Sequence, residues 1–137
     1  MKRLCAFMVA ALFILVTGCS DSTSSNGDKM EVLPKLSSIQ QEVFNTSCAF
    51  SSCHGGAVYP TLVTGQSYGS LVQGQSQGKP GEIFVIPGNS NDSYLIKKLK
   101  GFSGTISGEQ MPKGSAPLSN AVIDSIAKWI DLGAENN

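Results

Sequence analysis

The sequence predicts an all-α domain, and three observations lead to this fold class. Three stretches carry apolar residues at helical spacing between residues that typically begin and end helices. Strand signals are weak, since the apolar run at 83–86, Ile-Phe-Val-Ile, has no evident partner strand. Loops rich in glycine and proline lie at 74–81, 87–89 and 101–117. Long loops in a small domain usually carry a function or fold around another body, such as a bound ligand. We expect three to five helices.

The N-terminus has the pattern of an export signal. Lys2 and Arg3 form a short basic start, and they precede an apolar run from Leu4 to Val16. This run is too short to cross a bilayer comfortably as a helix, which is typical of a secretory signal rather than of a membrane anchor. We expect residues 1–18 to be removed as a signal peptide.

The end of this segment, Leu-Val-Thr-Gly-Cys19, resembles the lipobox of bacterial lipoproteins. The resemblance implies that Cys19 is lipidated and becomes the mature N-terminus. Ser20 stands where an aspartate would hold a lipoprotein at the inner membrane, so the outer membrane is favoured over the inner membrane. Residues 20–30 are small, polar and without periodicity. We therefore expect residues 19–35 to form a lipidated cysteine and a flexible tether, and residues 36–137 to form one domain.

The first helix of this domain is expected to open at Ser37. Gln40 follows three positions later, which is the pattern of a capping box. Ile39, Val43 and Phe44 then fall on one stripe of the helix. The helix is expected to run directly into a cluster of cysteine and histidine residues.

The second helix is expected to start near Ser90, with Asp92 in its first turn, and to end at Gly101. Its last turn carries three lysines, which complement the helix dipole: Lys97, Lys98 and Lys100. A short helical turn from Tyr68 to Gln73 is also expected.

The last helix has the strongest signal in the chain. It is expected to begin at Ser119 and to stop at Gly133. Its apolar face comprises Val122, Ile123, Ile126, Trp129 and Ile130. Trp129 is the only tryptophan of the chain, and we expect it to be a large core residue.

The most informative motif is Cys48 and Cys53 followed directly by His54, the only histidine of the chain. This pattern is typical of covalent haem attachment, in which the two thiols bond to the porphyrin vinyl groups and the histidine becomes the proximal iron ligand. The common spacing is CxxCH, whereas here four residues separate the thiols, so the loop between them has to bulge. Ser51 and Ser52 would let it bend. The alternative is a local disulfide between Cys48 and Cys53, with His54 an ordinary surface residue.

The number of cysteines agrees with this interpretation. Cys5 leaves with the signal peptide, Cys19 takes lipid, and Cys48 and Cys53 take haem. No thiol is left for a disulfide framework. Export agrees as well, because covalent haem attachment takes place outside the bacterial cytoplasm.

The charge of the chain argues against nucleic acid as a partner. Without Lys2 and Arg3, the chain has eight basic and ten acidic residues, a net charge of −2, and its basic residues form no stripe. The lysines of the second helix are explained by a solvated helix face, and the alternative is a docking patch for an acidic redox partner.

From about residue 37 to residue 134, the chain resembles the small monohaem c-type cytochromes, in particular their bacterial lipoprotein versions. The resemblance rests on four parts of the sequence. These are Phe44 to Cys48 with Cys53 to Gly56, residues 85–88 with 93–95, Met111-Pro112, and residues 126–134. It implies a small fold wrapped around one covalent haem c, with the last helix crossing the first near Phe44.

The resemblance also places the distal iron ligand at Met111, in an irregular loop shortly before the last helix. The mature chain has one other thioether, Met30, which lies in the tether. A thioether ligand raises the reduction potential relative to a second histidine. The alternative for Met111 is a flexible core filler, in which case the distal position is open and the protein binds small gases.

We expect an electron carrier rather than an enzyme, because the sequence contains no convincing acid/base pair, nucleophile or phosphate loop. Its partners would be redox proteins of the bacterial envelope and, through lipid, a membrane. One rival is a haem enzyme or gas sensor with an open distal site. Another is a non-haem envelope lipoprotein in which Cys48 and Cys53 form a disulfide.

Overall fold

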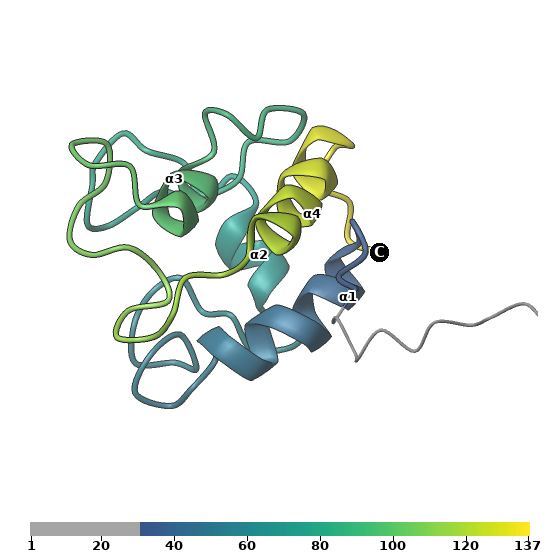
Figure 1. The fold of residues 1–137 in the computed structure, drawn as a ribbon, viewed down its shortest axis with the longest axis horizontal. Helices are drawn as coiled ribbons and strands as arrows, with labels where there is room; N and C mark the ends of the chain where they lie inside the picture. Colours follow the sequence, from purple (N-terminus) through teal and green to yellow (C-terminus); the bar gives the residue numbers. More distant parts are fainter. Residues whose placement is uncertain (1–30) are drawn as a thin grey trace, which may run out of the picture.

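A computed structural model of the protein describes residues 31–137 (Figure 1). The helical segments are α1 (Leu36–Ile39), the π-helix η1 (Gln40–Cys48), α2 (Ser67–Leu71), α3 (Tyr94–Lys100) and α4 (Asn120–Asp131). No strand occurs in this part of the chain, so the all-α class is confirmed for it. The expected signal peptide, lipidated Cys19 and most of the tether lie outside the described residues. Val32, which we assigned to the tether, is buried in the core.

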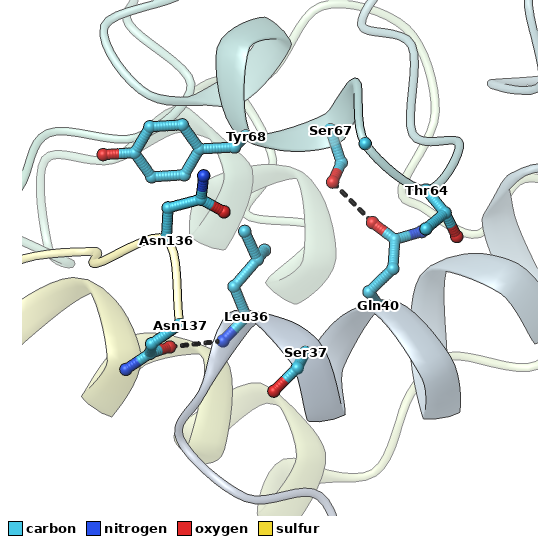
Figure 2. A pocket seen from close by; sticks show the side chains of 9 residues that line it. Leu36, Ser37, Gln40, Thr64, Ser67, Tyr68, Asn136 and Asn137 are labelled. Atoms are coloured by element: carbon cyan, nitrogen blue, oxygen red, sulfur yellow. Dashed lines mark hydrogen bonds between the residues drawn. The ribbon is translucent and has the colours of Figure 1, made fainter.

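The first helical run is capped by the far end of the chain. It begins at Leu36, one residue before the expected start, and no side chain of the preceding residue caps it. The main-chain N–H of Leu36 donates to Asn137 Oδ1 (3.0 Å), as Figure 2 shows. The N–H of Ser37 donates to the main-chain oxygen of Asn137 (2.8 Å). The predicted capping box at Ser37 and Gln40 is therefore wrong, because a distant residue satisfies the free N–H groups of this helix end.

Gln40 instead fixes the π-helix that follows. This side chain is 7 % exposed, and its Nε2 donates to Asn45 Oδ1 (2.6 Å) and to the carbonyl of Leu62 (2.8 Å). Its Oε1 accepts a hydrogen bond from Ser67 Oγ (2.5 Å), as Figure 2 shows. Side chains three or four positions apart face each other on an α-helix, whereas Gln40 and Asn45 are five positions apart. The Gln40–Asn45 bond therefore matches the wider π-helical turn, which ends at Cys48.

The apolar segment 83–86 has partners that the sequence did not reveal. Val85 forms an isolated parallel bridge with Val72, and Ile83 forms an antiparallel bridge with Gln75. The first residues of α3 donate main-chain hydrogen bonds to the same segment. It is thus an extended segment that lies between the loop after α2 and the start of α3.

Helix α3 starts four residues later than expected. The side chains of Asn89 and Asp92 bond to each other (2.7 Å), and the Asp92 N–H donates to Asn89 Oδ1 (3.1 Å). Such local side-chain bonds stabilise a non-helical backbone. Residues 90–92 therefore form a turn, and the helix begins at Tyr94 rather than Ser90. The predicted end is confirmed, since Gly101 caps the helix in the left-handed conformation with φ of 69°.

Helix α4 confirms its predicted limits. Ser119 Oγ accepts a hydrogen bond from the Val122 N–H (3.4 Å), and Gly133 follows the helix with φ of 107°. Its buried face comprises Ile123, Ile126, Trp129 and Ile130. Trp129 is 1 % exposed and donates from Nε1 to the carbonyl of Glu135 (2.8 Å), so its expected core role is confirmed. Helix α4 contacts α3, and both contribute to one core that also includes Phe44 of η1.

Replacing Ile126 with alanine should destabilise the protein strongly. Ile126 is fully buried, and removing most of its side chain costs its burial energy and leaves a cavity, about 2–5 kcal/mol in total. Chemical denaturation of the full chain measures the loss. The exposed Asp124→Ala on the same helix is the control, with an expected change of about 0.5 kcal/mol or less. Equal effects of the two variants would contradict the core assignment.

Candidate functional site

The Cys/His motif forms a loop that closes on its own start. Cys48 is the last residue of η1, and the His54 N–H donates back to its carbonyl (3.2 Å). Inside the loop, the N–H groups of Cys53 and Gly55 both donate to the carbonyl of Phe50 (2.9 Å each). The four intervening residues thus bulge outward, as the spacing predicted, while His54 returns to the end of the helix that carries Cys48.

Gly55 is required for this closure. A Cβ atom at Gly55 would lie 2.6 Å from the carbonyl oxygens of both Ala49 and Phe50, closer than real Cβ contacts come. Any side chain here would push the loop away from the helix end. Gly55 therefore gives the backbone room beside the carbonyls of the loop itself.

Both thiols of the motif are free. Cys48 is half-buried and Cys53 is exposed. Burial, and to a smaller extent the nearby Cys53, raises the pKa of Cys48 to about 11. Cys48 is therefore a neutral thiol at ordinary pH.

His54 is held by two main-chain oxygens. Its Nδ1 lies 2.8 Å from the carbonyl of Pro60 and 3.2 Å from that of Val58. Because both partners only accept hydrogen bonds, Nδ1 carries the proton, and the lone pair of the neutral ring is on Nε2. This is the arrangement in which a second partner orients a metal-binding histidine and fixes its tautomer. Sequence reasoning missed Val58 and Pro60, because a carbonyl acceptor leaves no mark on residue identity.

Large apolar side chains are exposed within the motif and in the loop after α3. Phe50, between the two cysteines, is 53 % exposed, and Val58 is 48 % exposed. Phe102, at the start of the loop that leads to Met111, is also 53 % exposed. These side chains are therefore available to contact a ligand bound at the motif loop or at the Met111 loop.

Met111 lies where the sequence placed it, in an irregular loop between α3 and α4. It is half-buried against the hydrophobic core, and its N–H donates to the carbonyl of Lys98 (2.9 Å). In Figure 1 the loop 101–118 and the motif loop 49–62 both lie to the left of the view, away from the C-terminus. The role of Met111 as an iron ligand stays a prediction.

The three lysines of α3 have different surroundings. Lys97 pairs with Glu82 (2.7 Å), and this hydrogen bond is the main cause that lowers the pKa of Glu82. Lys98 donates to main-chain carbonyls of the following loop, and burial lowers its pKa. Only Lys100 is exposed. A fully solvated face thus describes Lys100 alone, and the docking patch for an acidic redox partner stays a prediction.

One pocket of the described residues lies away from the Cys/His motif (Figure 2). It has a volume of about 210 Å³ and is lined by α1, the start of η1, α2 and the C-terminal residues. None of Cys48, Cys53, His54 and Met111 lines it. Between residues 31 and 137, every buried polar side-chain atom has a hydrogen-bond partner, and no three His, Cys, Asp or Glu side chains converge on a common point. The Cys/His loop is the candidate site because of its sequence motif and the hydrogen bonds that orient His54.

Comparison of the chain with models of known protein families, with curated proteins and with solved structures finds no match. Among residues 31–137, no helix has both the length and the apolar character needed to cross a lipid bilayer. The function proposed for this protein therefore rests on the residues of the site and their geometry.

The two thiols should differ in reactivity in the haem-free chain. Cys53 is exposed, whereas the pKa of Cys48 is raised from 9.0 to about 11, which lowers its thiolate fraction at pH 8 about a hundredfold. Iodoacetamide should therefore label Cys53 first, as read by peptide mass spectrometry. In Cys53→Ser, the labelling rate of Cys48 should keep rising between pH 9 and 11.

The same labelling in guanidinium is the control, because unfolding exposes both thiols and should remove the difference. Equal labelling rates in the folded chain would show that Cys48 is not shielded as described.

Proposed function

We propose that this protein is a monohaem c-type cytochrome that carries single electrons in the bacterial envelope. The domain from residue 36 to 137 would wrap around one covalent haem c, held by Cys48 and Cys53. One observation carries the proposal: beside two free thiols, His54 has its Nδ1 bonded to main-chain oxygens and its Nε2 available for a metal. Lipidation of Cys19 would anchor the protein, with the outer membrane favoured and redox proteins as partners.

The free thiols support covalent attachment. In attachment, the S–H bond of each cysteine adds across one vinyl double bond of the porphyrin. A sulfur–carbon bond forms, the hydrogen ends on the neighbouring vinyl carbon, and no oxidant is consumed. Cys48 and Cys53 have to be reduced for this reaction, and both are free thiols. Gly55 supports the same proposal, because it lets the loop return His54 to the helix end next to Cys48.

The axial ligands suit electron transfer. His54 would bind the iron through Nε2, with its ring orientation set by the carbonyls of Val58 and Pro60. Met111 would supply a thioether, a soft ligand that favours the ferrous state. When bound, the haem supplies an Fe(II)/Fe(III) couple that exchanges one electron. If both His54 and Met111 hold the iron, the haem would exchange electrons rather than bind a substrate.

The rival functions have less support. An open-site enzyme or gas sensor would use a distal histidine or arginine, yet His54 is the only histidine and Arg3, in the expected signal peptide, is the only arginine. A non-haem lipoprotein with a Cys48–Cys53 disulfide would leave the fixed tautomer of His54 without a purpose. The exposed apolar side chains of the site would also have no ligand to cover.

Replacing Met111 with alanine should open the distal position. The variant should keep its covalent haem, lose the near-infrared absorption of Met-ligated ferric haem, and bind carbon monoxide faster in the ferrous state. Its reduction potential should fall by on the order of 0.1 V, a small part of the range that axial ligands control. Absorption spectroscopy and potentiometry measure these changes.

Met30→Ala is the matched control, since Met30 is the other methionine expected in the mature chain. It should behave as the wild type does. Ferric and ferrous spectra of Met111→Ala that equal those of the wild type would rule out Met111 as the ligand and favour the open-site function.

A further inference from the structure

The loop that carries Met111 is tied to α3 at several points, although it has no regular structure. Between Gly101 and Met111 the chain forms no helix or strand. Tyr94, at the start of α3, accepts a hydrogen bond on its hydroxyl from the Ser107 N–H (2.8 Å). The remaining ties come from the last turn of the helix, directly beside Met111.

Lys98 makes the first of these ties. Its Nζ donates to the carbonyls of Ser107 (2.9 Å) and Glu109 (2.5 Å), two residues that approach Met111 from the N-terminal side. A charged donor makes hydrogen bonds about twice as strong as neutral ones. The ammonium group of Lys98 thus holds two carbonyls of a loop that has no helix or strand of its own.

Gln110 makes the second tie. Its Nε2 donates to the carbonyl of Leu99 (2.7 Å), one of the last carbonyls of α3 that has no partner within the helix. The side chain lies so close to Gly101 that a Cβ there would be 2.5 Å from its Cδ and Oε1. The next residue, Met111, donates its N–H to the carbonyl of Lys98 (2.9 Å). The backbone of Met111 is therefore fixed both by its own N–H and by the residue before it.

We propose that Lys98 and Gln110 are positioning residues that hold the Met111 loop on α3 and thereby set how firmly Met111 occupies the distal side of the haem. This inference rests on the proposed function, since it concerns the same site. Neither residue is proposed as an iron ligand. Both act by restricting the loop, because a ligand on a free loop pays conformational entropy each time it binds.

We call the hydrogen bonds of Lys98 and Gln110 to the Met111 loop and to α3 the clamp. Exogenous ligands should displace Met111 more easily when the clamp is removed. Lys98→Met keeps most of the aliphatic stem but loses the ammonium group, and Gln110→Ala loses the bond to Leu99. Both variants should keep covalent haem. Ferric Lys98→Met should bind imidazole about tenfold to a hundredfold more tightly than the wild type, the factor that a charge-assisted hydrogen bond corresponds to. Gln110→Ala should show a smaller shift in the same direction.

Lys100→Met is the matched control, because this lysine lies on the same helix and is exposed. Its imidazole affinity should equal that of the wild type, as titration of the absorption spectrum would show. Lys98→Arg keeps a charged donor and should restore part of the wild-type affinity. A merely structural role of Lys98 would change thermal stability without this pattern of ligand affinity.

The outcomes separate this inference from the proposed function. Wild-type imidazole affinity in both Lys98→Met and Gln110→Ala would overturn the clamp and leave the cytochrome function standing. If Lys98→Met does not fold, Gln110→Ala decides alone. Equal imidazole affinity of Met111→Ala and the wild type would overturn the clamp, because Met111 would not be the ligand it positions. Absence of haem from the wild type would overturn both.

Discussion

The candidate site depends on one imidazole whose orientation the main chain fixes. The carbonyls of Val58 and Pro60 engage Nδ1 of His54, so Nε2 keeps its lone pair and a fixed direction. This is achieved by folding the motif loop back on the end of η1, where the His54 N–H reaches the carbonyl of Cys48. The two additional residues between the cysteines are thus accommodated by a bulge of the loop. Gly55 permits this bulge because, without a side chain, it can lie close to the carbonyls of Ala49 and Phe50.

An aromatic row connects this loop with α3, the helix to which the Met111 loop is hydrogen-bonded. Tyr59, next to the Pro60 carbonyl, meets Phe84 edge-on with ring centroids 5.8 Å apart, and Phe84 lies 6.0 Å from Tyr94 of α3. Aromatic pairs in this distance range contribute about 0.5–1.5 kcal/mol beyond their burial. Tyr94 in turn accepts the Ser107 N–H of the Met111 loop. The loops proposed to supply the two iron ligands are therefore braced on the same row of side chains.

Helix ends with a clear local capping signal were predictable, and features that depend on distant contacts were not. The limits of α4 follow from Ser119 and Gly133, because capping acts within one turn. The cap of α1 by Asn137 was not predictable, since the two residues are 101 positions apart. The Pro60 carbonyl at His54 and the Lys98 clamp were missed for a related reason. A main-chain acceptor has no sequence signature. A lysine on a helix is predicted to be solvated unless the residues that lie next to it in the fold are known.

The most direct test of the central claim is the mass of the intact chain under denaturing conditions, after expression in a bacterium that exports the protein and attaches haem. Thioether bonds survive denaturation, whereas a haem held only by coordination dissociates. The structure and the motif predict that the wild type carries the added mass of one haem and shows a haemochrome spectrum in alkaline pyridine. The double variant Cys48→Ser/Cys53→Ser should carry none. A wild-type chain with the mass of the polypeptide and its lipid alone, and no haem absorption, would contradict the proposal.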